Sequence, residues 1–324
     1  MTIDAPDAGL AFVTSGGLRR SRTPTVTLYS RNETPMLSNR ILGLYSLVLV
    51  SMLCARTEAA ALTPAPAVTS PRLYVIDCGT LTNDTPEDYG LTRDEVRTAL
   101  FADMCYLIVH PKGTLLWDTG LPDRQVGRPI YEYMLGKHIA EIKMNTLVGQ
   151  LADIGYEPAA IDYLALSHYH FDHSGNANLF AKTATWLVAK PEWQAMFEPA
   201  NGAKVNGSED FEQLKSAKTL YVDENHDVFG DGTVVIKQAF GHTPGHSVLQ
   251  VKLANAGNLL LVGDLYHYPE EITLKKIGKR ESATDAPKSR ARIEALAKET
   301  KAQIWLSHDL FLFKSLRHAP AFYD

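Results

Sequence analysis

The sequence predicts a mixed α/β sandwich in residues 72–324, on three observations. Short apolar runs bounded by glycine, proline or charged residues recur along this region and are typical of strands. Apolar residues at helical spacing appear only at intervals between these runs. The chain of 324 residues is 45% apolar and 21% charged, which is enough to bury a core in one or two domains. Because the strands follow one another in meanders, packed sheets covered by helices are favoured over a doubly wound parallel sheet.

The first half of this region contains four predicted strands and one predicted helix. The strands are expected at residues 73–77, 105–110, 114–118 and 161–166. Residues 111–113 (PKG) give a hairpin turn signal between the second and third strands. Residues 145–155 predict a helix, because Leu147, Leu151 and Ile154 follow one another at spacings of four and three.

The second half continues the plan with more strands and one long helix. Strands are expected at residues 185–189, 219–222, 233–239, 247–253, 258–263 and 303–306. The helix is expected at about residues 286–299, with Asp285 as its N-cap and Pro287 in its first turn. Ile293 and Leu296 lie on one face of this helix and are expected to pack on a sheet.

The N-terminal segment carries the signals of an exported protein. Residues 41–53 (ILGLYSLVLVSML) form a short apolar run after Arg40, and Ala59 and Ala61 supply the small residues of a cleavage site. The run is short for a transmembrane helix, so residues 36–61 are predicted to be a signal peptide, with an uncleaved anchor as the alternative. The mature protein is then expected to be periplasmic or secreted and to keep no stable membrane span.

Two segments flank the predicted signal peptide. Signal peptides normally begin close to the initiator, so translation is expected to start at Met36, and residues 1–35 are expected to be an extension that the natural protein lacks. Residues 62–71 are rich in proline and alanine and are predicted to be a linker. The folded domain is therefore expected to span residues 72–324.

Charge and cysteine content narrow the possible functions. The net charge is −5 at pH 7 and no long basic run occurs, so nucleic acid is not an expected partner. Only Cys78 and Cys105 would remain after cleavage, and they could form a disulfide in an exported protein or stay as buried thiols. The sequence has no C-x-x-C pair, so a metal site built on cysteine ligands is not predicted.

The most informative segment is HYHFDH at residues 168–173. It directly follows a predicted strand, so its loop can turn four potential metal ligands to one point; they are His168, His170, Asp172 and His173. Imidazole nitrogen and carboxylate oxygen suit zinc and similar divalent metals. Four ligands on one ion would close the position that a catalytic zinc keeps open, so two ions are predicted. Tyr169 and Phe171 are expected to point away from the site and to pack.

Further ligands are expected where other apolar strands end. His242 lies in the segment GHTPGH, which also contains His246. Asp264 ends the strand LLLVGD, and His308 ends the strand IWLSH. A buried strand that ends on a polar residue can deliver that side chain to the rim of a site, so these residues are candidate partners of the six-residue segment.

These segments together resemble the metallo-β-lactamase superfamily. The family's motifs occur in its usual order, as H-x-H-x-D-H at 168–173, GHTPGH at 241–246, GD at 263–264 and SHD at 307–309. Asp118 in WDTG resembles the family's early strand-end aspartate, which supports the site loop. The resemblance covers roughly residues 72–320 and implies an αβ/βα four-layer sandwich.

The resemblance also implies a metallo-hydrolase with two divalent ions. Zinc is the usual occupant, and iron, cobalt or manganese suit the same ligands. One ion would be held by His168, His170 and His242, the other by Asp172, His173 and His308, with Asp264 bridging them. By the same resemblance, His246 is expected to be structural and not a ligand.

Within the superfamily, the segment LSHYHFDHSGN is most similar to the N-acyl-homoserine lactone lactonases, which degrade quorum-sensing signals. The position of SHD near the C-terminus and the extended stretch at 121–144 add to this similarity. The stretch is expected to be a surface loop that accommodates an acyl chain or only covers the core; its apolar residues are Ile130, Tyr131, Tyr133, Met134 and Leu135.

The mechanism implied for such an enzyme is hydrolysis of a carboxylic ester bond in a small lactone or ester. A hydroxide shared by two cations would attack the carbonyl, and Asp172 or Asp264 would return a proton to the leaving oxygen. These lactonases often carry a tyrosine three residues after the bridging aspartate, but here that position is His267. Either the neighbouring Tyr266 substitutes, or His267 takes a polar role, or the substrate differs.

Other members of the superfamily are alternatives. They are a glyoxalase-type thioesterase, a β-lactamase and an organophosphate hydrolase, and a metal-binding protein without catalysis is a further one. The basic residues at 275–280 could bind a glutathione thioester or could be a solvated surface. Family analogy also suggests a homodimer.

Overall fold

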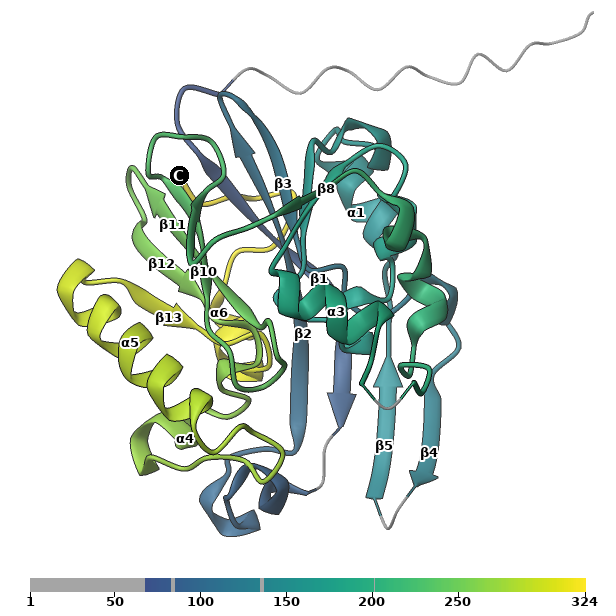
Figure 1. Cartoon of the computed structure of the whole chain (residues 1–324), viewed down its shortest axis with the longest axis vertical. Helices are drawn as coiled ribbons and strands as arrows, with labels where there is room; N and C mark the ends of the chain where they lie inside the picture. The colour runs from purple at the N-terminus through teal and green to yellow at the C-terminus, as the bar shows by residue number, and fades with distance from the viewer. Residues whose placement is uncertain (1–67, 83–84, 135–136, 201) are drawn as a thin grey trace, which may run out of the picture. The chain divides into compact units, whose positions relative to one another are not determined.

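The computed structural model describes residues 68–324, apart from 83–84, 135–136 and 201, and these residues form two sheets packed face to face (Figure 1). The larger sheet has eight strands in the order β4-β5-β1-β2-β3-β6-β7-β8, and the smaller has five in the order β13-β12-β11-β10-β9. Apolar side chains from both sheets form the core between them, with Trp117 from one side and Ile236 and Leu249 from the other.

The larger sheet combines an antiparallel meander with a parallel half. Six of its strands are β1 (Arg72–Thr82), β2 (Leu100–His110), β3 (Gly113–Trp117), β6 (Tyr163–Ala165), β7 (Thr185–Val188) and β8 (Thr219–Tyr221). Side chains along β2 alternate: Met104 and Tyr106 face the smaller sheet, while Cys105 and Leu107 face the outer helices. Those helices are α1 (Leu147–Asp153) and α3 (Lys190–Phe197). Both faces of this sheet are therefore covered.

The smaller sheet is covered on its outer face by one long helix. Its strands are β9 (Asn225–Asp227), β10 (Val234–Gln238), β11 (Ser247–Leu253), β12 (Gly257–Leu261) and β13 (Gln303–Trp305). The helix α5 (Asp285–Thr300) packs on this sheet through Ile293, which meets Val248 and Leu260. The layers thus run helix, sheet, sheet, helix, which confirms the predicted four-layer sandwich. Three short helices complete the fold: α2 (Phe171–Ser174), α4 (Pro269–Leu274) and α6 (Leu310–Ser315).

Every predicted strand and helix overlaps an observed one, but two predictions need correction. Residues 121–144 are not simply a surface loop, because they contain a hairpin of β4 (Ile130–Met134) and β5 (Lys137–Ile142), and β5 pairs with β1. An edge hairpin satisfies its backbone through pairing and needs no strong apolar pattern. Asp285 is the first residue of α5 and not its cap, and its carboxylate accepts a hydrogen bond from Ser282.

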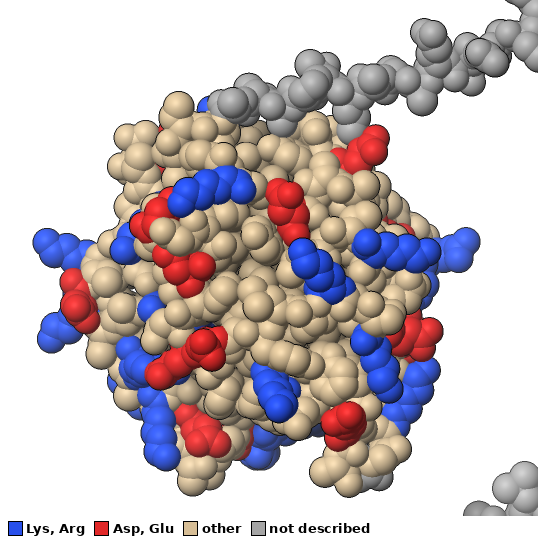
Figure 2. Space-filling view, turned by 45° about the horizontal axis from the view of Figure 1, so that its top comes forward, with Lys and Arg blue, Asp and Glu red and all other residues tan. Residues whose placement is uncertain are grey.

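The predicted extension at 1–35, the predicted signal peptide at 36–61 and most of the predicted linker lie outside the described residues. Among the residues that are described, no helix has the length and apolar character needed to cross a membrane. The face drawn in Figure 2 carries lysine and arginine mixed with aspartate and glutamate, and no patch of one sign gathers there.

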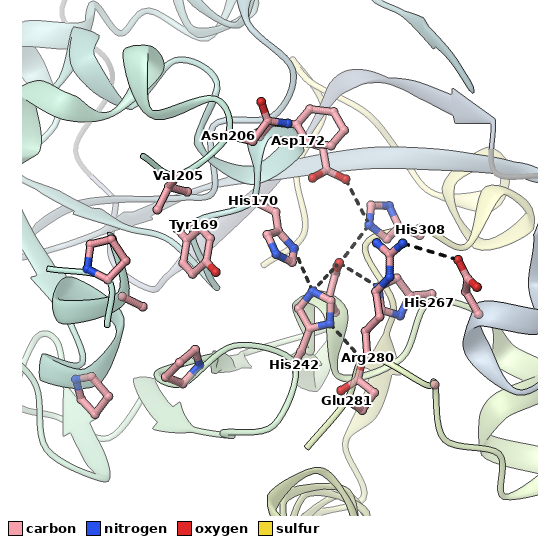
Figure 3. A pocket seen from close by; sticks show the side chains of 18 of the residues that line it. Tyr169, His170, Asp172, Val205, Asn206, His242, His267, Arg280, Glu281 and His308 are labelled. Carbon is pink, nitrogen blue, oxygen red and sulfur yellow. Dashed lines mark hydrogen bonds and ion pairs between the residues drawn. The ribbon is translucent and has the colours of Figure 1, made fainter. Parts of the chain in front are cut away.

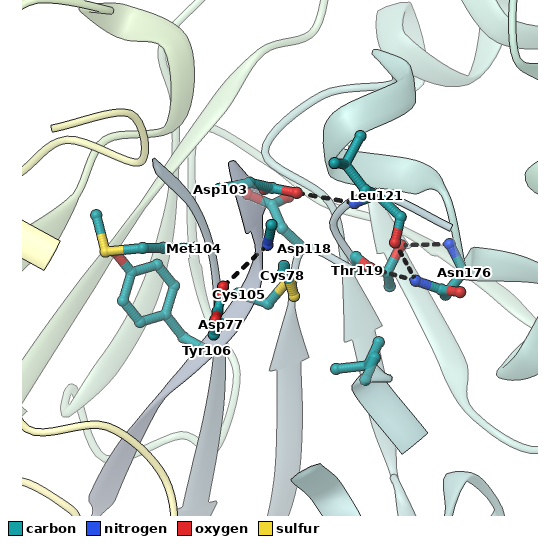
Figure 4. The surroundings of a disulfide bond; sticks show 12 residues. Asp77, Cys78, Asp103, Met104, Cys105, Tyr106, Asp118, Thr119, Leu121 and Asn176 are labelled. Carbon is teal, nitrogen blue, oxygen red and sulfur yellow. Dashed lines mark hydrogen bonds between the residues drawn. A yellow bond between two sulfur atoms is a disulfide. The ribbon is translucent and has the colours of Figure 1, made fainter. Parts of the chain in front are cut away.

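The two cysteines that the sequence left open are joined. Cys78 on β1 and Cys105 on β2 form a disulfide between neighbouring strands (Figure 4). Gly120, which follows β3, packs directly on this bond, because a Cβ at that position would lie 2.2 Å from Cys78 Cβ. The disulfide therefore lies beneath the loop that supports the candidate site.

Candidate metal centre

The side chains that the sequence predicted as metal ligands converge beside one cavity (Figure 3). Each comes from a segment that follows a strand: β6 for the six-residue motif, β10 for His242, β12 for Asp264 and β13 for His308. They form a first group of His168, His170, His242 and Asp264 and a second group of Asp172, His173 and His308. Within each group all the potential ligand atoms lie within 4.8 Å of one another.

In the first group, three imidazole nitrogens point at one another. The Nδ1 atom of His170 lies 2.9 Å from His168 Nε2 and 3.0 Å from His242 Nε2. A neutral imidazole has one N–H and one lone pair, so three facing nitrogens cannot all satisfy each other, whereas one cation can accept three lone pairs. Burial lowers the pKa of His170 and of His242 to about 3, so both rings are neutral at pH 7, as metal ligation requires.

Asp264 lies between the two groups. One carboxylate oxygen, Oδ1, is 3.1 Å from His173 Nε2 and 3.1 Å from His308 Nε2. The other oxygen, Oδ2, is 3.4 Å from His242 Nε2. Each oxygen thus faces a different group, which is the arrangement that the predicted bridging role requires.

The carboxylates around the second group favour a positive charge there. Burial opposes protonation of His308, but Asp264 and Asp172 outweigh it and raise its pKa to about 9. Burial is likewise outweighed at His173, whose pKa lies well above the ordinary value because of Asp264, Asp118 and Asp172. Within the described residues, His173 Nε2 and Asp264 Oδ1 are buried without a hydrogen bond of ordinary geometry. A divalent cation between these atoms would supply this positive charge, so this donor set fits a metal.

In three of the ligand rings, Nδ1 donates a hydrogen bond to an acceptor on the side of the ring that faces away from the site. His173 donates to Asp118 Oδ2 at 3.0 Å, His308 to the Ala102 carbonyl at 2.8 Å, and His242 to Glu281 Oε1 at 2.9 Å. Such partners fix the tautomer and leave Nε2 free to face the site. Asp118 also accepts the backbone N–H of Ser167 at 2.6 Å, so it supports the ligand loop as the sequence predicted.

Glu192 on α3 ties two ligand loops together, and the sequence analysis missed it. Its Oε1 accepts the backbone N–H of Tyr169 at 2.9 Å, and its Oε2 accepts from Thr243 Oγ1 at 2.7 Å and Gly245 N at 2.8 Å. Burial raises the pKa of Glu192 to about 7, against the effect of these donors. A single glutamate on a short helix gives no sequence signal, so only the fold reveals it.

His246 lies outside both groups. Its Nε2 accepts the backbone N–H of Asp264 at 3.1 Å, so Nδ1 carries the proton and donates to the Ala239 carbonyl at 3.1 Å. Both ring nitrogens are therefore used by the backbone. The ring is fully buried and fixes the turn that carries Asp264, in keeping with the predicted structural role.

Of the two neighbours proposed to replace the expected tyrosine, only His267 reaches the site. His267 Nε2 lies 3.0 Å from Asp264 Oδ2, and the residue lines the cavity. The Tyr266 hydroxyl instead donates to Glu294 on α5 at 2.8 Å, and its ring packs in the outer core of the smaller sheet. The backbone is extended here, so consecutive side chains point to opposite sides. The prediction that Tyr266 contacts the substrate is therefore wrong.

The cavity above the two groups has a volume of about 1130 Å³. Figure 3 shows Tyr169 and Val205 to one side of His170 and His242, with Arg280 and Glu281 to the other. The first side comes from α3 and the following residues. Its apolar residues are Pro191, Ala195, Pro199, Ala200, Ala203 and Val205, and its polar residues are Gln194, Glu198, Lys204 and Asn206. The apolar residues form a surface on which an apolar group can pack.

The sequence made two predictions about the residues that line this cavity. Tyr169 and Phe171 were predicted to point away, but both line the cavity, because the chain turns into α2 at Phe171 and brings the motif's intervening side chains to the rim. Residues 121–144 do not contribute to the lining among the described residues, and the side chains at 131–139 lie outside the description. The predicted acyl contact of that stretch therefore stays a prediction.

The basic residues at 275–280 are largely paired with acidic side chains. Lys275 contacts Glu294 at 2.9 Å, and Lys276 contacts Glu95 at 3.6 Å. Arg280 lies 3.8 Å from an oxygen of Asp88. These contacts fit a solvated surface better than a patch that binds an anionic thioester.

Comparisons with known proteins agree with this geometry. Residues 100–308 match the family model described as the metallo-beta-lactamase superfamily. N-acyl homoserine lactonase AttM of Azorhizobium caulinodans is 29% identical over 275 residues, covering 79% of this chain and 100% of that protein. AiiA of Bacillus thuringiensis subsp. kurstaki, also an N-acyl homoserine lactonase, is 26% identical over 236 residues, covering 67% of this chain and 85% of that protein.

Solved structures give the same result. An N-acyl homoserine lactone hydrolase, with the product N-hexanoyl-L-homoserine bound at its catalytic metal centre, superposes with a TM-score of 0.66 and 25% identity. The match covers 79% of this chain and 100% of that one. The quorum-quenching dizinc lactonase AidC superposes with a TM-score of 0.55 at 18% identity, covering 82% of this chain and 98% of that one, which speaks for the fold alone.

Proposed function

Because this chain belongs to the metallo-beta-lactamase superfamily, we propose that it is a metal-dependent lactonase that opens N-acyl-homoserine lactone rings. The relatives that it matches along most of its length are N-acyl homoserine lactonases. The observation that carries the proposal is the convergence of two groups of imidazole and carboxylate ligands beneath a cavity with apolar side chains on one wall.

We propose zinc as the metal, in two copies. The donors are five imidazoles and two carboxylates without a thiolate, a set that suits zinc and that iron, cobalt and manganese can share. When bound, such a pair of cations lowers the pKa of a water and polarises the substrate carbonyl. Asp264 would bridge the ions, with His168, His170 and His242 holding one and Asp172, His173 and His308 holding the other.

The remaining chemistry falls to residues of the chain. Opening the ring releases an alkoxide oxygen that needs a proton, and a carboxylate that has accepted one from the attacking water can return it. Asp172 lines the cavity, 3.6 Å from His308 Nε2, and Asp264 lies between the groups. His267 Nε2 lies 3.0 Å from Asp264 Oδ2 and can orient this carboxylate. We therefore assign proton transfer to Asp172 or Asp264 and a positioning role to His267.

The substrate's acyl chain would pack on the wall formed by α3 and by Pro199, Ala200, Ala203 and Val205. This wall offers apolar side chains beside Tyr169 and His170, so a lactone ring at the ligand groups could extend its chain along them. The amide of an N-acyl lactone would then lie between the metal ligands and this wall.

Hydrolysis of N-hexanoyl-homoserine lactone by the purified mature chain tests this function. We expect turnover that a chelator abolishes and added zinc restores, and slower reactions with thioesters, β-lactams and phosphotriesters. Asp264→Ala and His170→Ala should lose both turnover and bound metal. Faster reaction with one of the other substrate classes, or lactone turnover that survives removal of all metal, would contradict the proposal.

We also propose that the protein is exported. The disulfide between Cys78 and Cys105 supports this, because disulfides persist mainly in oxidising compartments. Cell fractionation of the native host, with mass analysis of the mature N-terminus, tests the predicted cleavage near residue 61. A full-length chain recovered from the cytoplasm would contradict it. The homodimer suggested by family analogy is tested by light scattering of the same sample.

A further inference from the structure

A third group of potential metal ligands lies beside the candidate centre and shares one histidine with it. The group consists of His242, His267 and Glu281, whose potential ligand atoms all lie within 4.8 Å of one another. All three residues line the cavity, and Figure 3 shows His267 and Glu281 on the side of His242 that faces away from His170. His267 and Glu281 belong to neither of the two groups that would hold the catalytic ions. A cation bound by them would therefore be a third one.

His242 has one ring nitrogen facing each side. Its Nε2 faces His170 Nδ1 at 3.0 Å, whereas its Nδ1 donates a hydrogen bond to Glu281 Oε1 at 2.9 Å. The proton of this hydrogen bond lies between a nitrogen and an oxygen that both suit zinc as ligands. A cation that replaces it bonds to Nδ1 and to the carboxylate, and the displaced proton goes to solvent. The His242 ring then binds one cation through each nitrogen.

His267 supplies a nitrogen that no protein group uses. Its Nε2 lies 3.0 Å from Asp264 Oδ2, so this nitrogen carries the proton in the contact with the carboxylate. Its Nδ1 is buried without a hydrogen bond among the described residues. Glu271 Oε2, 3.8 Å from Nδ1, instead accepts the backbone N–H groups of His267 and Tyr268. The unpaired lone pair on Nδ1 costs free energy in this buried place, and a bound cation would remove that cost.

The spacing of the three side chains fits a cation of the size of zinc. Two ligands on one zinc ion lie at most about 4.2 Å apart, because each bond is about 2.1 Å long. The three ligand atoms, all within 4.8 Å of one another, therefore need only small side-chain rotations to share an ion. Binding should be weaker than in the two catalytic groups, since the cation must displace a proton and bind a ring that already holds another cation. The site would fill only when zinc is in excess.

We propose that His242, His267 and Glu281 form a third cation site, and that excess zinc in this site inhibits the enzyme. The third cation replaces the hydrogen bond that orients His242 for the first group. It also occupies the cavity wall beside His267, next to the place where a lactone ring would bind. The site itself follows from its ligands, whereas the inhibition rests on the proposed lactonase function.

Equilibrium dialysis of the two-zinc protein against increasing zinc concentrations tests the site. We expect the wild type to take up a third equivalent and His267→Phe to stop at two, because phenylalanine keeps a ring but offers no nitrogen. Glu281→Gln should bind the third equivalent more weakly than the wild type, because the amide carries no charge. A wild type that stops at two equivalents, or a third equivalent that persists in His267→Phe, would overturn the site.

Asp88→Asn is the matched control, since Asp88 lines the same cavity but belongs to no group of potential metal ligands among the described residues. This variant should take up the third equivalent with the wild-type affinity. An equal loss in Asp88→Asn and His267→Phe would mean that the third cation is not held by this particular group, and the proposal would fall.

Lactone turnover at rising zinc concentrations tests the inhibition. The wild-type rate should fall as the third equivalent binds, over the same range of zinc concentrations. The rate of His267→Phe, relative to its own rate with two zinc ions, should stay constant over that range. A third equivalent that binds without slowing turnover would overturn the inhibition. If the wild type hydrolyses no lactone, the proposed function fails, and the dialysis result still decides whether the site exists.

Discussion

The two ligand groups differ in the part of the fold that supplies the hydrogen-bond acceptors for their histidine Nδ1 atoms. In the second group, His173 is held by Asp118 at the end of β3, and His308 by the Ala102 carbonyl on β2. Both supports belong to the larger sheet. In the first group, the support of His242 is Glu281, on a loop between α4 and α5 that also borders the cavity. A support within a sheet is more rigid than one on a loop, so we expect the second group to hold its cation more tightly.

The largest expected effect comes from removing one ligand of each group. His242→Ala and His308→Ala should each lower kcat/KM by about 10³-fold or more, because the reaction uses both ions together. They should differ in what remains bound after dialysis: His242→Ala should keep the tightly held second-group ion, while His308→Ala keeps only the weakly held first-group ion and should therefore retain less metal. Elemental analysis after dialysis measures this. The same metal content in both variants would break the comparison.

The second-largest effect is expected from the carboxylates that accept hydrogen bonds from the ligand histidines. Asp118→Asn and Glu281→Gln remove a carboxylate behind a ligand histidine, and such changes cost about 10- to 100-fold in metal affinity. Asp118→Asn should lie at the upper end, because Asp118 also accepts the backbone N–H of Ser167 and thus orders the ligand loop. Competition with a coloured chelator gives both affinities. A larger loss in Glu281→Gln would reverse the proposed order of rigidity.

The sequence reveals the ligands of this site but few of their supports. His168 to His173 form one continuous motif after a strand, and Asp264 and His308 each end a strand, so the pattern of polar residues after apolar runs predicts them. Asp118 is predictable for the same reason. Glu192 lies on a short helix and Glu281 on a loop, where no periodic pattern marks them. Their partners are distant in sequence, so only tertiary structure brings them together.

The fold shows the same division between strong and weak local patterns. Buried strands such as β2 and β11 are clear in the sequence because their apolar runs are continuous. The edge hairpin of β4 and β5 is not, since its pairing depends on β1 and not on its own pattern. The choice between Tyr266 and His267 depended on backbone direction at one strand end, and a single-residue shift reverses which side chain faces the cavity.

The disulfide offers a smaller and separate test of the sheet-based support. It joins β1 to β2 beneath the loop of Asp118 (Figure 4) and closes 27 residues of chain, for which about 3 kcal/mol of stabilisation is expected. The double variant Cys78→Ser/Cys105→Ser should lower the free energy of unfolding by about this amount in a urea titration. It should also release second-group metal faster than the wild type does. Unchanged stability under reducing conditions would show that the disulfide contributes nothing to this support.

The smallest expected effect contrasts Tyr266 with the site that it was first predicted to serve. Tyr266→Phe removes a hydroxyl that donates to Glu294, a carboxylate whose side chain is 32% exposed and also contacts Lys275. Water and Lys275 can therefore satisfy Glu294 after the change, and we expect a loss of about 1 kcal/mol in unfolding free energy. Both kcat and metal content should stay at wild-type values, because the hydroxyl points into α5 and away from both groups. A tenfold fall in kcat with stability unchanged would mean that the strand end can turn Tyr266 toward the substrate during the reaction.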